Sequence, residues 1–207
     1  MAVTWIVVSL ISCAGLPPER GNLPPEVPET GGHTVPVIPE RPIPPENIMG
    51  KGRVSGEKLA SFLLMNNARA DNDFVISLSG FYLEEAAVEG VDHDVAFAQM
   101  CLETGFLRYG GLVTPDMNNF CGLGAIGPEQ PGHNFPDPRT GVRAHIQHLK
   151  AYAAEEPLKQ ELVDPRFRYV KRGSSPAIYG LAGTWAADKL YSEKIAGILQ
   201  RLYDYSF

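Results

Sequence analysis

Residues 92–105 read DHDVAFAQMCLETG, and this stretch decides the fold. Asp92 is a residue type that begins helices, because its carboxylate can accept a hydrogen bond from a free N–H of the first turn. Gly105 is a residue type at which helices commonly end. Apolar residues recur between them at helical spacing, and Glu103 lies at the C-terminal end. The stretch therefore predicts a largely buried helix that ends in a glutamate.

Four further helices are predicted around this one. Ser55 and Asp73 are expected to cap the first two, and Gly90 to end the second. The four expected helices cover residues 55–66, 73–90, 140–152 and about 187–203. Residues 110–139 are rich in Gly, Pro and Asn and lack helical periodicity, with space for a short hairpin within 112–138. Irregular segments of this length are uncommon in compact domains and are usually functional.

The N-terminal part of the chain differs in composition from the rest. Ten of the 18 prolines lie between Pro17 and Pro45. Pro opposes both helices and central strands, because it lacks an N–H and fixes φ. We therefore predict a disordered Pro-rich linker over 14–52 and a single domain of mainly α structure over 53–207. That length suits one hydrophobic core.

Residues 1–13 read MAVTWIVVSLISC and predict an export signal. The apolar run is too short to span a bilayer and suits the apolar region of a signal peptide. It ends in Leu10-Ile11-Ser12-Cys13, which resembles a bacterial lipobox and implies cleavage before Cys13 and lipid attachment to its sulfur. We therefore expect an exported, membrane-anchored lipoprotein of the cell envelope. The alternatives are a simple secretory leader, which would give a secreted protein, or a misassigned start residue.

The composition argues against several classes of protein. The formal charge is −6, from 18 Lys+Arg and 24 Asp+Glu. Nucleic-acid-binding proteins usually present a basic face, so we expect no nucleic-acid partner. No apolar run approaches the roughly 20 residues that a spanning helix needs. An apolar content of 44% supports a packed interior rather than a wholly disordered chain.

Glu103 is the first candidate for chemistry. At the C-terminal end of an apolar helix, a carboxyl group is next to the negative end of the helix dipole and is partly desolvated. Both effects favour the protonated form and raise the pKa. A raised pKa suits a general acid at near-neutral pH. The structural alternative is a glutamate that pairs with an arginine such as Arg108.

Four blocks of sequence resemble the bacterial glucosaminidase family, glycoside hydrolase family 73, whose members are cell-wall hydrolases with a lysozyme-like fold. The blocks are VAFAQMCLETG at 95–105, NNFCGLG at 118–124, GVRAHIQHLKAY at 141–152 and GTWAADKLY at 183–191. They occur in the family's order, and the resemblance covers most of residues 55–203. It implies a mainly α, lysozyme-like α(+β) domain with a small irregular or hairpin segment.

The resemblance also implies roles by position. Glu103 matches the family's catalytic acid. The residues that match the motif lining the sugar cleft, or aromatic positions near the substrate, are Asn118, Asn119, Phe120, Trp185 and Tyr191. Amide groups can bond the N-acetyl and hydroxyl groups of a sugar, and the ring of Phe120, Tyr109 or Trp185 could stack on a sugar face. The alternatives are that the Asn pair forms a turn and that the aromatic residues belong to the core.

A glycosidase usually has a second carboxyl group at roughly 5–9.5 Å from the first. The candidates in the irregular segment are Asp116, Glu129 and Asp137. We place Glu129 first, because it lies in a Gly- and Pro-rich loop after the Asn motif. Two other routes need only one acid. In one, the N-acetyl oxygen of the substrate attacks the anomeric carbon; in the other, a lytic transglycosylase forms an anhydro product.

We predict no metal and no cofactor. His145 and His148 lie three residues apart on one expected helix, but neither an HExxH pattern nor a Cys/His cluster accompanies them. The alternative is favoured: Gln147 and His148 belong to the family-like block and are expected to make structural or cleft-wall hydrogen bonds. Cys101 and Cys121 could form a disulfide in an exported protein, or could remain two buried thiols.

Together these observations predict a peptidoglycan hydrolase. It would be an endo-β-N-acetylglucosaminidase that cleaves β-1,4 bonds of the GlcNAc–MurNAc glycan, with Glu103 as general acid. Its partners would be peptidoglycan glycan strands and, through Cys13, the membrane, and we expect a monomer. The alternatives are a non-catalytic wall-binding lipoprotein, and a lytic transglycosylase or muramidase that uses the same glutamate.

Overall fold

The helix expected from residues 92–105 lies at the centre of the fold. In the computed structural model, which describes residues 41–207, it is helix α3 (His93–Glu103). Only its last two residues, Leu102 and Glu103, are not buried. The Asp92 side chain accepts hydrogen bonds from two N–H groups of the first turn, as predicted for an N-cap.

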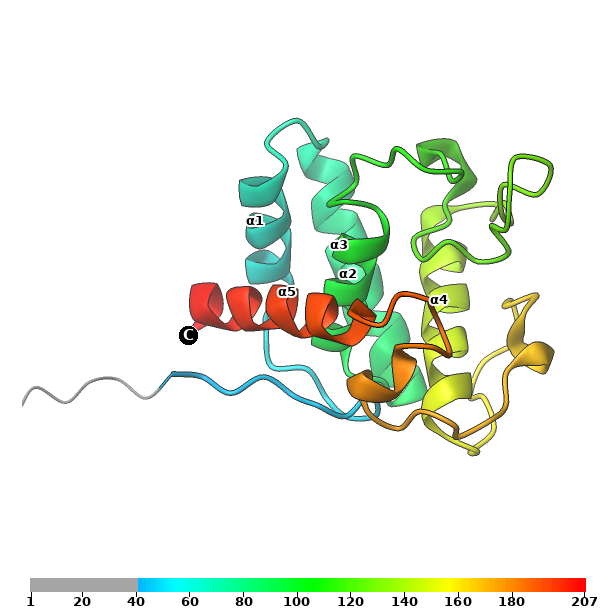
Figure 1. Ribbon diagram of the computed structural model, residues 1–207. Coiled ribbons are helices and arrows are strands. Elements are labelled where there is room, and N and C mark those ends of the chain that lie inside the picture. The colour runs from blue at the N-terminus through cyan, green and yellow to red at the C-terminus, as the bar shows by residue number, and fades with distance from the viewer. Residues whose placement is uncertain (1–40) are drawn as a thin grey trace, which may run out of the picture. The chain divides into compact units, whose positions relative to one another are not determined.

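Four other α-helices surround α3, and the mainly α fold is confirmed. They are α1 (Gly56–Asn66), α2 (Asn72–Glu89), α4 (Pro138–Ala153) and α5 (Tyr191–Ser206). Helix α3 packs against α2, α4 and α5, and α5 runs across the lower ends of α1 and α3 in the view of Figure 1. Three short 3-10 helices complete the described part: η1 (Pro115–Met117), η2 (Phe167–Tyr169) and η3 (Ile178–Leu181).

Some predicted helix ends are correct and others are wrong. Ser55 caps α1, and Gly90 ends α2 with a left-handed φ of 77°. Helix α2, however, is capped by Asp71 rather than Asp73, because the Asp71 carboxylate accepts from the Phe74 N–H at 2.7 Å.

The predicted starts of the last two helices are also wrong. Helix α4 begins two residues before Thr140, because Asp137 is its cap and Pro138 suits its first position. Helix α5 begins at Tyr191 rather than Ala187. Asp188 instead forms a turn, in which its side chain accepts from the Leu190 N–H at 2.9 Å.

The packed region also begins earlier than the predicted boundary at residue 53. Ile48 is fully buried. Its N–H donates to the Pro176 carbonyl at 2.9 Å, and its carbonyl accepts from the Asp92 N–H at 2.8 Å. The part of the predicted 14–52 linker around Ile48 is therefore an integral part of the domain. The predicted signal segment 1–13, the lipidation site Cys13 and linker residues 14–40 lie outside the described residues.

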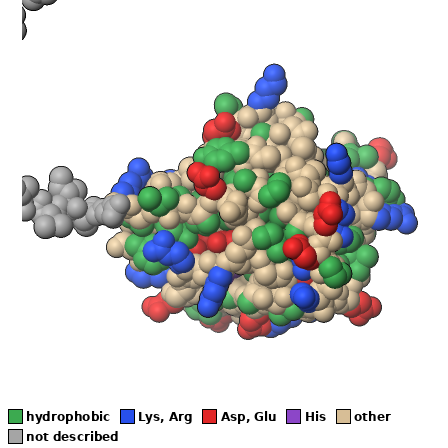
Figure 2. Space-filling view, turned by 90° about the horizontal axis from the view of Figure 1, so that it is seen from below, with side chains coloured by type: hydrophobic (Ala, Val, Ile, Leu, Met, Phe, Trp, Pro, Cys, Tyr) green, Lys and Arg blue, Asp and Glu red, His purple; other side chains and the backbone are tan. Residues whose placement is uncertain are grey.

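The segment between α3 and α4 is irregular, as expected. Of the short hairpin expected within 112–138, only an isolated bridge between Gly127 and Gln130 is present. In Figure 1 the segment lies over one end of α4. Figure 2 shows basic and acidic side chains interspersed on the face that it displays. Within residues 41–207, no helix combines the length and the apolar character that crossing a membrane requires.

A buried ion pair joins α2 to α4. Glu89 and Lys150 are almost completely buried, and Lys150 Nζ lies 2.8 Å from Glu89 Oε2. Lys150 Nζ also donates to the Pro157 carbonyl at 3.0 Å, and the Glu89 carboxylate accepts from the backbone N–H groups of Lys159 and Gln160. The pair therefore fixes the loop that follows α4 as well as the two helices.

Removing the negative partner of this pair should destabilise the domain strongly. Glu89→Gln leaves Lys150 as a buried charge without a counter-charge, so we expect a loss of about 3–5 kcal/mol in the free energy of unfolding. Urea unfolding followed by circular dichroism measures it. The control is Glu84→Gln, which breaks an exposed pair with Arg139 and should cost less than about 1 kcal/mol. Equal losses in the two variants would contradict the assignment.

Candidate functional site

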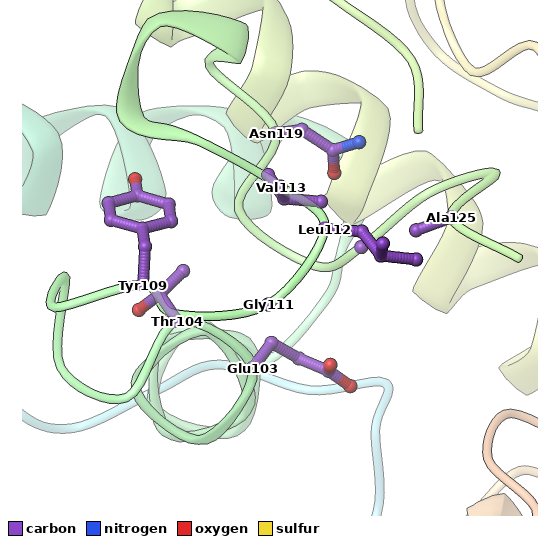
Figure 3. Close-up of a pocket in the computed structure, with 9 residues that line it drawn as sticks. Glu103, Thr104, Tyr109, Gly111, Leu112, Val113, Asn119 and Ala125 are labelled. Atoms are coloured by element: carbon purple, nitrogen blue, oxygen red, sulfur yellow. The ribbon is translucent and has the colours of Figure 1, made fainter. Parts of the chain in front are cut away.

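Helix α3 ends at a surface depression, and Glu103, its last residue, is part of the lining. The wall of this depression is formed by the segment that follows α3 and by a second segment that begins at the Asn motif. Its lining residues are Glu103, Thr104, Tyr109, Gly111, Leu112, Val113, Asn119, Gly122 and Ala125 (Figure 3). Glu103 is the only carboxyl-bearing side chain among them, so a ligand bound here meets a single acid.

The chain after α3 turns in an unusual backbone conformation. Gly105, Phe106, Leu107 and Tyr109 have φ values of 57°, 58°, 60° and 55°. A left-handed conformation costs a non-glycine residue roughly 1–2 kcal/mol, so it persists only where surrounding contacts impose it. Here Thr104 imposes it: its hydroxyl accepts from the Leu107 N–H at 2.9 Å and its carbonyl from the Tyr109 N–H at 2.8 Å. The turn brings Tyr109 into the wall of the depression.

Two side chains hold the Glu103 carboxyl group. The Tyr191 hydroxyl donates to its Oε1 atom, and the Trp185 Nε1–H donates to the same atom at 3.1 Å. Although the residue as a whole is not buried, desolvation of its carboxyl group raises the pKa of Glu103 above its ordinary value, and the two hydrogen bonds oppose that rise. No residue in the described range donates to Oε2, which lies near Gly122: a Cβ added at Gly122 would be 3.9 Å from it. One oxygen is thus fixed and the other is available to a ligand.

A buried chain of hydrogen bonds supports Tyr191. Gln99 Nε2 donates to the Tyr191 hydroxyl oxygen at 2.8 Å, and Gln99 Oε1 lies 2.9 Å from His145 Nε2. On the other side of the ring, His145 Nδ1 lies 2.9 Å from the Tyr82 hydroxyl. Burial lowers the pKa of His145 to about 3, so the ring is neutral and has a single N–H. Since an amide oxygen only accepts, that N–H is on Nε2, and Tyr82 donates to Nδ1.

Every donor in this chain therefore points toward Glu103. The four groups come from four helices: Tyr82 from α2, Gln99 from α3, His145 from α4 and Tyr191 from α5. Hydrogen bonds in such a chain polarise one another in a low-dielectric interior. The arrangement fixes the position of the Tyr191 hydroxyl, and through it the position of Oε1.

Trp185 is held in place by three other rings. Its ring centroid lies 4.9 Å from that of His148, 5.4 Å from that of Tyr152 and 5.9 Å from that of His145. His148 is fixed in turn, because its Nδ1 atom lies 2.7 Å from an oxygen of the buried Asp164 carboxylate. These ring contacts and the hydrogen bond to Oε1 together position the indole beside Glu103.

A second depression adjoins the first. It is lined by residues 121–126 together with His148, Tyr152, Arg166, Thr184 and Trp185. The two depressions share Gly122 and Ala125. The hydrogen bond between Glu103, in the first wall, and Trp185, in the second, links them. Glu103 thus lies beside the border between the two hollows.

The Asn motif supports the loop that forms this border. Asn119 is buried, and its amide nitrogen donates to the Leu123 and His133 carbonyls, both at 3.0 Å. The Asn118 amide donates to the Phe135 carbonyl at 3.0 Å. Direct substrate contacts by Asn118 and Asn119 remain predictions, and Asn119 also lines the first depression.

Phe120 and Gly141 show how the Asn motif packs on the helices beneath it. Phe120 is fully buried against Phe74, so in this structure its ring cannot stack on a sugar, contrary to that expectation. A Cβ at Gly141 would lie 1.8 Å from the Asn118 carbonyl oxygen, so the motif rests directly on the backbone of α4. Only a glycine permits this approach.

The other candidate carboxylates are not in the depressions. Asp116, Glu129 and Asp137 are exposed, and none of them lines either hollow. Asp137 is the N-cap of α4, and Glu129 is in the turn closed by the bridge between Gly127 and Gln130. The role of Glu129 as a second catalytic group stays a prediction.

The two histidines considered as metal ligands are hydrogen-bonded, and the two cysteines considered for a disulfide are not joined in this structure. His145 and His148 are each hydrogen-bonded to protein groups, and no group of three or more potential ligands in residues 41–207 is arranged to hold a metal ion. Cys101 and Cys121 are free buried thiols, so this structure has the second of the two states considered for them.

Three residues near the site had no role predicted from the sequence: Gln99, Tyr152 and Arg166. One signal for Gln99 was available: it lies four residues before Glu103 in an apolar helix, and residues at that spacing share a face. No such signal exists for Arg166, because it reaches the site only through the long loop after α4.

Comparison with known proteins agrees with these findings. The family model Glucosaminidase, described as mannosyl-glycoprotein endo-beta-N-acetylglucosaminidase, matches residues 80–204. The matched range contains Glu103, the Asn motif, Trp185 and Tyr191. A protein of Borreliella burgdorferi described as an uncharacterized protein is 43% identical over 159 residues, which are 77% of this chain and 78% of that protein. The predicted relationship is confirmed, and the chain belongs to the glucosaminidase family of glycoside hydrolases.

Proposed function

We propose that the chain is an endo-β-N-acetylglucosaminidase that cleaves β-1,4 bonds of the GlcNAc–MurNAc glycan of peptidoglycan, with Glu103 as general acid. The observation that carries this proposal is the position of Glu103, whose carboxyl group has a raised pKa where two depressions meet. Membership of the glucosaminidase family supports a glycan substrate.

Glu103 would act by transferring a proton. The protonated carboxyl donates its proton to the glycosidic oxygen while the C–O bond breaks, and the sugar passes through an oxocarbenium-like transition state. The carboxylate that remains then removes a proton from the incoming water. Oε2 is the oxygen suited to both steps, because Oε1 is already engaged by Tyr191 and Trp185.

A lytic transglycosylase is the second candidate, and one observation favours it. Glu103 is the only carboxyl-bearing side chain lining the two depressions. A transglycosylase needs only one acid, because a hydroxyl of the substrate itself attacks the anomeric carbon. Mass spectrometry of the products separates the two functions: reducing ends indicate hydrolysis, and anhydro ends indicate transglycosylation. If reducing ends form, the activity of Glu129→Gln separates two possibilities. Lost activity would make Glu129 the second catalytic group, and retained activity would favour attack by the N-acetyl oxygen of the substrate.

Replacing the general acid should abolish activity without unfolding the protein. We expect Glu103→Gln to lower the release of glycan ends from purified peptidoglycan by about 10²–10⁴-fold, because an amide cannot transfer the proton. Circular dichroism should show an unchanged fold. Asp116→Asn is the matched control, since it removes an exposed carboxylate outside both depressions. Retained activity in Glu103→Gln would refute the mechanism, and sedimentation with peptidoglycan without lysis by the unaltered protein would favour the wall-binding alternative.

The pH dependence of activity should report the Tyr191 hydrogen bond. Activity is expected to fall as pH rises through the raised pKa of Glu103, because only the protonated carboxyl can donate. Tyr191→Phe removes a donor that stabilises the ionised form, so the pKa of Glu103 should rise further and the basic limb of kcat should move to higher pH.

The matched control for that experiment is Tyr109→Phe. Tyr109 lines the same depression but makes no hydrogen bond to Glu103. Its variant should leave the position of the basic limb unchanged, whatever its effect on KM. A limb that stays in place in Tyr191→Phe, or moves to lower pH, would contradict the proposed role of the hydroxyl.

We also propose that the protein is exported and anchored to the membrane by a lipid on Cys13. The support is the lipobox-like sequence Leu10-Ile11-Ser12-Cys13 ahead of the Pro-rich segment. Cells expressing the full chain should incorporate labelled palmitate into it, and Cys13→Ser should abolish the label. Equal labelling of both forms would exclude Cys13 as the anchor.

A further inference from the structure

Arg166 gives the second depression a charge that the proposed mechanism does not use. It is the only Lys or Arg among the residues that line the two depressions. The rest of the second wall consists of the backbone-rich segment 121–126, the rings of His148, Tyr152 and Trp185, and Thr184. A ligand extending past Trp185 would therefore meet one guanidinium group.

The guanidinium group of Arg166 has no acceptor among residues 41–207. It lies over the Tyr169 ring, with its central carbon 4.8 Å from the ring centroid. Its side chain takes part in no ion pair and no hydrogen bond of the described part. Other arginines differ: Arg143 pairs with the Glu85 carboxylate, and Arg172 donates to two backbone carbonyls. The five N–H donors of Arg166 are therefore available to a ligand.

A buried carboxylate fixes Arg166 in this wall. Asp164 Oδ1 accepts from the Arg166 backbone N–H at 2.7 Å, and Asp164 Oδ2 lies 2.7 Å from His148 Nδ1. The same carboxylate thus orients the start of the Arg166 turn and the imidazole that supports Trp185. Both Asp164 oxygens are engaged in this way and the residue is 2% exposed, and within residues 41–207 it forms no ion pair with the Arg166 guanidinium.

The charge of Arg166 also affects the pKa of a side chain that lines the second depression. Burial raises the pKa of the Tyr152 hydroxyl, and the nearby Arg166 opposes that rise. Tyr152 lines the same wall and donates to the Thr184 carbonyl at 3.2 Å. The positive charge therefore acts on the space that a ligand would fill.

We propose that Arg166 binds a carboxylate carried by the substrate, so that the second depression receives the acidic sugar of the glycan. This inference rests on the proposed function and names the part of the substrate that the second depression recognises. An arginine suits the role, because its planar fork can bind both oxygens of a carboxylate at once. On MurNAc the carboxylate has two sources: the free lactyl group of a glycan stripped of peptides, or the stem peptide.

Binding to soluble glycans tests the proposal whether or not they are cleaved. The full chain with Glu103→Gln, alone and combined with Arg166→Gln, is titrated calorimetrically with three ligands. These are a GlcNAc–MurNAc oligosaccharide with stem peptides, the same oligosaccharide after amidase removal of the peptides, and a GlcNAc oligomer without carboxylates. Loss of a charge-assisted hydrogen bond should weaken binding of a carboxylate ligand by about 10- to 100-fold, with binding of the GlcNAc oligomer changed less than about twofold.

Two further variants sharpen the result. Arg168→Gln is the matched control, because Arg168 is two residues away, is exposed and lines neither depression; it should leave all three affinities unchanged. Arg166→Lys keeps the charge but loses the planar fork, and should give an intermediate loss. Comparison of the two carboxylate ligands identifies the source, since only the one bearing the recognised group should respond fully.

Two binding results would overturn the proposal. An equal loss on all three ligands would make Arg166 a structural residue, and no loss on either carboxylate ligand would exclude it from recognition. Cleavage of peptidoglycan by the unaltered protein tests the proposed function separately. A protein that cleaves peptidoglycan but shows no ligand-dependent effect of Arg166→Gln would refute this inference alone.

Discussion

The hydrogen bond from Tyr191 to Glu103 is the interaction on which the site depends. Helix α3 is buried along most of its length, so its last residue is where the core meets solvent. A carboxyl group at that point is disfavoured as an anion by desolvation and by the helix dipole. Without the donor from α5, only the Trp185 Nε1–H would hold the side chain. With one, Oε1 is fixed and Oε2 is directed toward Gly122.

The polar groups behind Tyr191 explain why a domain of this size buries a glutamine and a histidine in its core. A buried polar group costs stability unless it is hydrogen-bonded. Gln99 and His145 satisfy each other, and Tyr82 and Tyr191 complete the chain at its two ends. The core therefore serves two purposes with the same residues. It joins four helices, and its hydrogen bonds hold Tyr191, and so the Glu103 carboxyl group, in a fixed position relative to them.

The sequence predicted local features well and long-range features poorly. The caps Ser55 and Asp92 and the stop at Gly90 were correct, because each depends on bonds within one turn. The start of α2 was misplaced because two aspartates lie at its N-terminal end, and the prediction took Asp73 where Asp71 makes the capping bond to the Phe74 N–H. Glu103 could be identified because its helix and its family motif are both local in sequence.

The roles of the remaining site residues depend on contacts that no local pattern records. The Asn119 amide donates to two carbonyls that are 4 and 14 residues away, a supporting role that the sequence pattern did not indicate. Arg166 enters the wall only because Asp164 bonds to a histidine of α4, 16 residues earlier in the chain.

The placement of Arg166 in the wall matters for electrostatic reasons. The chain has a net charge of −6, so its average field repels an acidic glycan, and salt screens that repulsion beyond about 10 Å at 0.1 M ionic strength. Recognition of an acidic sugar must therefore come from a positive group placed within contact distance. In the two depressions, Arg166 is the one permanently charged cation and Glu103 the one carboxyl group. On the proposal that Arg166 binds the acidic sugar, these two opposite charges would set the register of a glycan whose sugars alternate between neutral and acidic, with the scissile bond at Oε2 and the acidic sugar beyond Trp185.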